Sequence, residues 1–349
     1  MFVYIFAILL CIIFSYLGVI CKDKRKTFFN ILPMLILFII SALRYNVGID
    51  YSGTYTEVYY WVLDGVKNIR MDPGFVYIYK FIIMFNLDLQ WFFVISSFFI
   101  NLFVYLAIER ISSNKVLSWF IYICSTFYFF TMNGIRQSFV MAVFYWSLVF
   151  IKKKDVNKFL ILTFILSFFH MSALIFIPVY FLANYKFKSK NIFIIILIIL
   201  CFISPLILPV LIQVLSGTKY VLYFLHNNYN PLNSLNFSSL FNLLLFIVYL
   251  YKLNFKSNDD TYGYIFMLCH FIGVCLSIFL TSIPLVLRLF QSFRFIEFLS
   301  IPYLFDNYFK KNKFVLYVGV ISFYIFYFIF HVLINNANGV LPYLTIFER

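Results

Sequence analysis

The chain opens with FVYIFAILLCIIFSYLGVI at residues 2–20, and CKDKRK follows at residues 21–26. The first stretch has no charged residue and about the length that an α-helix needs to cross a bilayer. Its basic residues come after the apolar run, whereas a secretory signal carries them before it. Because basic residues favour the cytoplasm, we expect a helix that runs from outside to inside.

Similar apolar runs recur along all 349 residues. The chain is 64% hydrophobic and only 11% charged, which is too apolar for a water-soluble domain. We predict an all-α polytopic integral membrane protein with about ten to twelve transmembrane helices. The whole chain, 1–349, is expected to form one transmembrane domain with outer loops 44–89 and 213–236. The runs lie at about 2–20, 28–43, 90–109, 116–132, 134–151, 192–212, 237–252, 262–283, 285–305 and 314–334.

Lysine and arginine are distributed differently along this chain. Sixteen of the 19 lysines fall in six groups that suit cytoplasmic loops, and Lys67, Lys80 and Lys219 do not. Six of the eight arginines fall outside or within the membrane: Arg44, Arg70, Arg136, Arg288, Arg294 and Arg349. We infer that lysine sets the topology, whereas arginine serves chemistry at the outer half. The net charge of +14 is spread over short loops and does not indicate a face for nucleic acid.

Two lysine groups, at 152–158 and 186–190, flank the single stretch Phe159–Ala183. Both groups can face the cytoplasm only if this stretch enters the membrane and returns, as a re-entrant or broken helical hairpin (159–183) bent near His170. A single long span, with one lysine group outside, is the alternative. A further short helical segment, 44–88, is expected on the outer surface, since its apolar part at 75–87 is too short to span.

The arginines suggest a binding site for a lipid-linked phosphate. A guanidinium at bilayer depth is costly and usually marks a substrate path or an anion partner, and its planar donor fork suits phosphate. Arg136 and Gln137 follow Asn133-Gly134 at the outer start of a predicted helix, where free N–H groups also favour an anion. An Arg136 that merely snorkels to lipid head groups is the alternative.

A second arginine group lies late in the chain. Arg288, Gln291, Arg294 and Glu297 recur every three residues, which predicts a polar strip along one apolar helix. The arginines could hold a pyrophosphate, and Glu297 is expected to orient Arg294. A purely structural pairing of Arg294 with Glu297 is the alternative.

Acidic residues outside the membrane concentrate in the first outer loop. Asp50 is our first candidate for a general base, with His170 and Glu57 behind it. Asp50 could equally be a helix N-cap, and His170 could be a structural residue. Tyr51 and Tyr55 share one helical face and could stack on sugars or lie at the membrane interface.

An ordered set of short motifs resembles the EpsG family, which belongs with the Wzy-type bacterial polysaccharide (O-antigen or capsule repeat-unit) polymerases. The motifs are Arg44-Tyr-Asn-Val-Gly-Ile-Asp50-Tyr51-Ser-Gly-Thr-Tyr55, Gly134-Ile-Arg136-Gln137, Phe169-His170-Met-Ser172-Ala173, Pro178-Val-Tyr180 and the late arginine helix. The resemblance implies a metal-independent glycosyltransferase without a cofactor at the outer face of the bacterial inner membrane. Its donor and acceptor would be undecaprenyl-pyrophosphate-linked oligosaccharides, and a chain-length regulator protein is a possible partner.

The resemblance also carries over residue roles. Arg44 and Arg136 would contact pyrophosphate or sugar, His170 would belong to the polar centre, and Arg288 and Arg294 match the late arginine region. Other function classes stay open: an O-antigen ligase, a non-enzymatic flippase and a membrane O-acyltransferase. The four histidines and six cysteines show no metal-ligand spacing.

Overall fold

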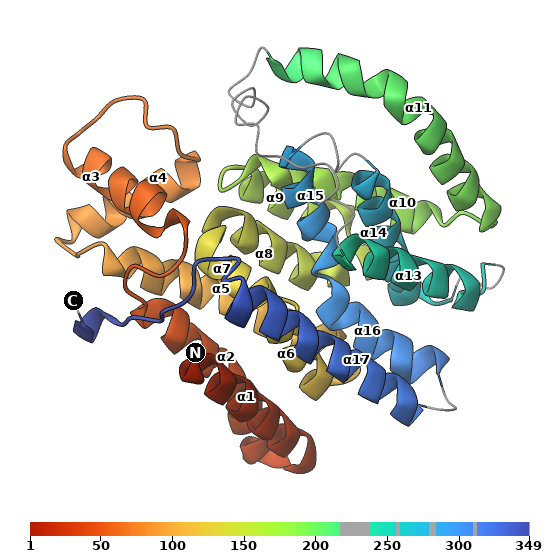
Figure 1. Cartoon of the computed structure of the whole chain (residues 1–349), viewed down its shortest axis with the longest axis horizontal. Helices are drawn as coiled ribbons and strands as arrows, with labels where there is room; N and C mark the ends of the chain where they lie inside the picture. Colours follow the sequence, from red (N-terminus) through yellow and green to blue (C-terminus); the bar gives the residue numbers. More distant parts are fainter. Residues whose placement is uncertain (217–236, 256–258, 279–283, 310–312, 349) are drawn as a thin grey trace. The chain divides into compact units, whose positions relative to one another are not determined.

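The computed structural model describes residues 1–216, 237–255, 259–278, 284–309 and 313–348. The described residues are helical almost throughout, and the one isolated β-bridge among them joins Arg44 to Thr345 (Figure 1). The predicted all-α class is confirmed. Contacts divide the chain into two compact units, Met1–Phe176 with Glu297–Arg349, and Ile177–Ile296.

Five described helices are long and apolar enough to cross a membrane. They are α1 (Phe2–Ile20), α2 (Asp23–Leu43), α5 (Gln90–Ile111), α8 (Ile135–Lys152) and α17 (Lys313–Phe328) continued by η5 (Ile329–Ile334). A sixth span results if α6 (Lys115–Cys124) and α7 (Phe127–Asn133), bent by 50°, cross together. The chain is a multi-pass membrane protein. Among the described residues, fewer helices reach full span length than the ten to twelve predicted, because several apolar helices have only 10–17 residues.

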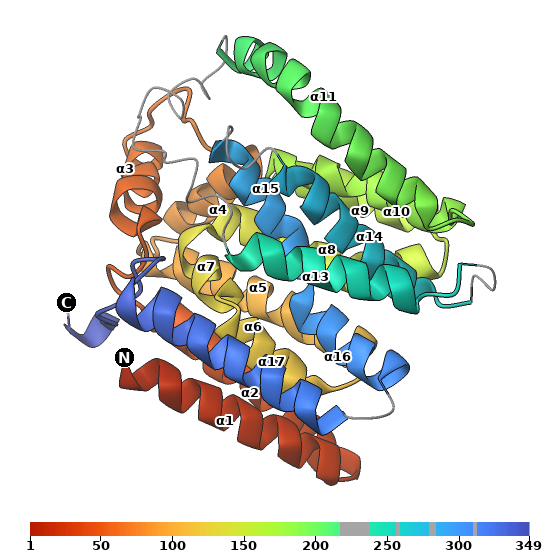
Figure 2. The same ribbon diagram turned by 45° about the vertical axis from the view of Figure 1, so that its right-hand side comes forward.

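In the first unit, α6 lies deep among the other helices. It contacts α1, α17 and α16 (Glu297–Tyr308), and every residue from Leu117 to Cys124 is buried (Figure 2). On the other side of α1, α2 packs between α1 and α5, and α5 packs on α8. The outward faces of these helices remain apolar, with exposed side chains such as Phe6 and Phe326. Helices that are apolar on all sides are typical of contact with lipid.

The spans of the first unit place their basic ends together. Near the start of α2, Asn30 lies 3.5 Å from Glu109 at the end of α5, and Arg110 stacks on Trp146 near the end of α8. At the opposite end, the side chain of Gln90 at the start of α5 donates to the carbonyl of Arg44. All three helices therefore have one basic end and one end that adjoins residues 44–88.

The segment from 44 to 88 folds into three short helices, as predicted: η1 (Tyr51–Thr56), α3 (Glu57–Leu63) and α4 (Pro73–Met84). The predicted break near His170 is also present, since α9 (Val156–Ser167) ends before the 3₁₀ turn η2 (Met171–Phe176). The bent helix pair of near-span length, however, is α6–α7, where Thr126 has a left-handed φ of 73°. That conformation is rare for a β-branched residue and interrupts the helix there.

The second unit contains α10 (Ile177–Tyr185), α11 (Asn191–Ser216), α13 (Phe237–Lys252), α14 (Thr261–Ser277) and α15 (Pro284–Arg294). Within it, α14 packs against each of the other four helices. Most of the predicted outer loop 213–236 lies outside the described residues. The predicted helix at 285–305 is interrupted: α15 ends at Arg294, and α16 begins at Glu297. The polar strip therefore does not continue along one helix, because the helical repeat stops at Phe295–Ile296.

Candidate functional site

The break between α7 and α8 is where residues 44–56 attach to the membrane helices. The Tyr55 hydroxyl donates to the carbonyl of Asn133 at 2.8 Å and accepts from the N–H of Ile135 at 3.0 Å. The Asn133 side-chain oxygen accepts from the N–H of Asp50 at 2.9 Å. Tyr55 thus pairs one of the N–H groups that a helix leaves unpaired at its start. These contacts hold the segment beside Arg136 in the first turn of α8.

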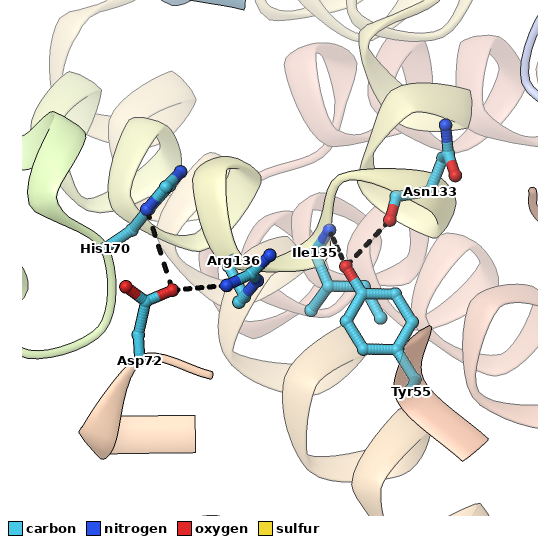
Figure 3. Close-up of polar contacts among 6 residues, drawn as sticks. All are labelled: Tyr55, Asp72, Asn133, Ile135, Arg136 and His170. Carbon is cyan, nitrogen blue, oxygen red and sulfur yellow. Dashed lines mark hydrogen bonds and ion pairs between the residues drawn. The ribbon is translucent and has the colours of Figure 1, made fainter. Parts of the chain in front are cut away.

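Asp72, Arg136 and His170 form a polar cluster next to this attachment (Figure 3). Arg136 Nη1 donates to Asp72 Oδ2 at 2.6 Å, and His170 Nδ1 lies 3.7 Å from the same oxygen. The longer distance suits an ion pair but exceeds that of a hydrogen bond. The side chains of Arg136 and His170 remain 26% and 27% exposed. The cluster can therefore be reached by a ligand.

Asp72 is ionised at neutral pH in this arrangement. Burial raises the pKa of its carboxyl, but His170 and Arg136 together lower it by more, so that the net pKa lies below the ordinary value. An ionised Asp72 can hold the guanidinium and attract the imidazole at once. Because a guanidinium carries five N–H donors, Arg136 has others to offer to an anion.

Close backbone contact brings Asp72 to His170. Asp72 is the N-cap residue of α4, with Pro73 in the first turn. The N–H of Gly74 donates to the carbonyl of Phe168 at 2.9 Å, and a Cβ at position 74 would lie 2.7 Å from the Phe169 ring. Only glycine allows α4 to approach the turn at 168–170 this closely.

Arg44, in contrast, is sealed inside the first unit. It is 1% exposed, donates from Nη1 to the Ser41 carbonyl at 2.9 Å, and stacks 4.8 Å from the centre of the Phe93 ring. Among the described residues, no acceptor lies within hydrogen-bonding distance of its Nε or Nη2. The C-terminal segment covers it, through the bridge to Thr345 and a bond from the N–H of Tyr45 to the Leu344 carbonyl. A ligand cannot reach Arg44 in this conformation.

The other predicted residues of the first unit differ in accessibility. Tyr51 and Tyr55 are buried, and Tyr51 stacks on Phe93 at 4.4 Å, so neither ring is available to a sugar here. Gln137 is also buried, whereas Glu57 is exposed. Asp50 is half-buried at the N-cap position of η1, without a side-chain capping bond. Burial, followed by the charge of Asp50, raises the pKa of Tyr55 to about 12.

The late arginine group belongs to the second unit. Arg294 is 4% exposed, and its Nη1 donates to the hydroxyl of Ser238 on α13 at 2.9 Å. Arg288 is exposed on α15, with Gln291 one turn further along. Glu297 starts α16 in the first unit and accepts from the Tyr324 hydroxyl at 2.6 Å.

One family model matches the chain, that of the EpsG family, over residues 26–345. The chain belongs to the EpsG family. This family is associated with exopolysaccharide biosynthesis. The comparison with curated proteins and that with solved structures found no match.

Sequence reasoning missed Asp72 as a site residue of this EpsG-family protein. Met71-Asp72-Pro73-Gly74 leads into α4, with Asp72 at the N-cap and Pro73 at the first position. The sequence did offer one signal, since Asp72 directly precedes a proline and lies in the same outer loop as Asp50 and Glu57. No sequence pattern links position 72 to 136 or 170, because their contact depends on the fold. Among the described residues, no three His, Cys, Asp or Glu side chains are placed to share a metal ion.

Proposed function

We propose that this EpsG-family protein is a glycosyltransferase that polymerises undecaprenyl-pyrophosphate-linked oligosaccharide repeat units. The observation that carries the proposal is the cluster of Asp72, Arg136 and His170, in which an accessible guanidinium and an accessible imidazole share one carboxylate. A sugar transfer from a pyrophosphate needs a cation for the departing group and a base for the attacking hydroxyl. The cluster contains both.

The position of the cluster supports an outer active site. Arg136 stands at the start of α8, whereas Lys152 stands at its end, and α2 and α5 likewise carry basic residues at the end away from residues 44–88. By the positive-inside rule, the basic ends face the cytoplasm and the cluster faces outside. A lipid-linked donor would bring its pyrophosphate to this depth.

In the proposed reaction, a hydroxyl oxygen of the acceptor sugar attacks the anomeric carbon of the donor. The bond from that carbon to the pyrophosphate oxygen breaks, and its electron pair leaves with the lipid pyrophosphate. Arg136 stabilises the developing negative charge through donors that are already in place. The hydroxyl proton passes to His170 Nε2, while Asp72 faces Nδ1 and stabilises the imidazolium that forms. Inversion at the anomeric carbon follows from a single displacement.

The geometry changes the order of the candidate bases. His170 precedes Asp50 because it lies beside an ionised carboxylate, as a base in a catalytic dyad does. Asp50 is close enough to Tyr55 for its charge to raise the pKa of the Tyr55 hydroxyl. We propose that Asp50 also attracts the Arg136 guanidinium. The buried Arg44 and Tyr55 are proposed to stabilise the fold around the cluster without contacting the substrate. Arg288 and Gln291 of the second unit remain proposed substrate contacts. Arg294, predicted as a third, is 4% exposed and donates to Ser238, so a ligand cannot reach it in this conformation.

The test is polymerisation by purified protein of a defined polyprenyl-pyrophosphate oligosaccharide, with no nucleotide sugar and no added metal. We expect a ladder of glycans, and we expect His170→Gln to reduce its rate by roughly 10²-fold or more. His331→Gln is the matched control, since this histidine lies on η5 and should leave the rate unchanged. Movement of lipid-linked units across vesicles without any ladder would instead identify a flippase.

A further inference from the structure

Two of the three lysines that depart from the cytoplasmic pattern line one hollow. Lys67 and Lys80 border a depression of about 620 Å³ that is lined by the end of α3, the connection after it and residues of α4 from Pro73 to Lys80. The third, Lys219, lies outside the described residues. The positive-inside rule gives no reason for lysines here. Their meeting at one concave surface therefore points to a ligand.

The lining combines positive charge with an aromatic ring. Lys80 Nζ lies 5.6 Å from the centre of the Tyr77 ring, and Tyr77 is 69% exposed. Among the described residues, no aspartate or glutamate lines the hollow. Of the nearest acids in the chain, Asp72 is paired with Arg136, and Asp64 is exposed beyond the lining. The hollow thus presents two ammonium groups to an incoming molecule.

An acidic sugar has the complementary chemistry. The C–H face of a pyranose ring can pack on the Tyr77 ring, while its carboxylate accepts charge-assisted hydrogen bonds from Lys67 and Lys80. A volume of about 620 Å³ lies within the range of pockets that hold small ligands.

The position of the hollow favours a sugar over a lipid head group. Its lining includes Met71 and Pro73, on either side of Asp72, and continues along α4 as far as Lys80. The end of α4 beyond Lys80 exposes apolar side chains, Phe81 at 53% and Met84 at 76%, which suit the membrane surface. The hollow thus borders the turn that carries Asp72, although the side chains of Asp72, Arg136 and His170 are not part of its lining.

We propose that Lys67, Tyr77 and Lys80 form a subsite for a negatively charged sugar of the glycan substrate. This assignment rests on the proposed function for its setting and deepens it by naming the class of sugar. Binding can be measured without turnover, so a failure of the subsite and a failure of the polymerase assignment are distinguishable.

The experiment measures binding of two tetrasaccharides to the full-length protein in phosphatidylcholine nanodiscs at fixed ionic strength. One probe is tetragalacturonate, and the other is the neutral tetrasaccharide of galactose with the same linkage. The variants are Lys67→Gln with Lys80→Gln, and Tyr77→Ala. The matched control is Lys24→Gln with Lys26→Gln, which removes the same charge from exposed positions at the start of α2.

We expect the acidic probe to bind more tightly than the neutral one. The double lysine variant should lose roughly five- to tenfold in affinity for the acidic probe alone, because two exposed charge pairs are each worth little. Tyr77→Ala should weaken both probes, and the control should weaken neither. Equal binding of the two probes, or a preference that survives loss of both lysines, would overturn the proposal. So would displacement of the acidic probe by phosphatidylglycerol added to the nanodiscs, which would assign the lysines to lipid.

Discussion

Arg44 and Arg136 lie at the same end of the first unit, yet their surroundings are opposite. Arg136 is about a quarter exposed and pairs with a carboxylate, whereas Arg44 is 1% exposed among tyrosine and phenylalanine rings. The positive charges of both arginines act to lower the pKa of Tyr55, so the Tyr55 hydroxyl lies within electrostatic reach of each. The comparison teaches that the position of an arginine in the sequence does not predict whether its side chain is accessible and paired with a carboxylate.

The largest expected effect is at the accessible arginine. Arg136→Lys keeps the charge but loses the planar fork, so it can no longer hold Asp72 and a phosphate together. We expect the polymerisation rate to fall by about 10²- to 10³-fold, the range seen when one preorganised donor is removed. Ladder formation by purified protein measures it.

The control for this change is Arg110→Lys at the opposite end of α5, where the arginine stacks on Trp146. It should keep nearly full activity. A normal ladder from Arg136→Lys, with protein amounts matched, would remove the distinction between the two arginines.

Substitution of the buried Arg44 should lower the stability of the protein more directly than its activity. Arg44→Lys loses the stacking on Phe93 and the fork that reaches the Ser41 carbonyl. We expect a loss of roughly 1–3 kcal/mol of stability, typical of a buried charged hydrogen bond, and a fall in rate that follows the fraction of folded protein. Thermal unfolding in detergent and the rate at a permissive temperature measure the two effects. An unchanged melting temperature with abolished activity would show that Arg44 meets the substrate directly.

Substitution of Tyr55, which joins residues 44–56 to the start of α8, should lower the stability by a smaller amount. Tyr55→Phe removes the hydroxyl that pairs with both Asn133 and Ile135. We expect a loss of about 1–2 kcal/mol, because the N–H at the start of α8 is left without that partner. Hydrogen exchange at Ile135 should accelerate, while exchange in α1 stays unchanged. Equal protection in the variant would mean that the segment is held by other contacts.

The smallest effect concerns acid stability. The folded pKa of Asp72 is depressed, so its contribution is present above the ordinary pKa of about 3.9 and is lost as the pH falls through the lower folded value. Because the pair is partly exposed, we expect less than about 1 kcal/mol. The melting temperatures of wild type and Asp72→Asn should differ at pH 7, and the difference should shrink as the pH falls below the ordinary pKa of about 3.9. A difference that does not change with pH would assign the effect to packing.

Much of the fold follows from local sequence. Helix ends matched the apolar runs closely at α1, α5 and α8, because each run is bounded by charged or turn residues. The interruption at Phe295–Ile296 escaped prediction, since no glycine or proline marks it and apolar residues continue through it. The three-residue spacing therefore predicts one helix where the structure has two, α15 and α16.

The candidate site was only partly predictable. Arg136 and His170 stand at visible breaks, Asn133-Gly134 and the end of α9, where functional side chains are often placed. Their shared partner Asp72 lies 64 residues from Arg136 in the chain. Burial of Arg44 was equally hidden, because it depends on a C-terminal segment about 300 residues away in sequence, in which Tyr343 donates to the Ile40 carbonyl and Thr345 forms a bridge with Arg44.

In α4, the hydrogen bond from the Gly74 N–H to the Phe168 carbonyl involves different atoms from the side chains that line the hollow. This main-chain bond sets the spacing between Asp72 and His170, and glycine is needed at 74 because a Cβ there would lie 2.7 Å from the Phe169 ring. Side chains along the hollow take no part in that spacing. Related proteins could therefore exchange Lys67, Tyr77 or Lys80 to accept other glycans while the distance between acid and imidazole stays the same.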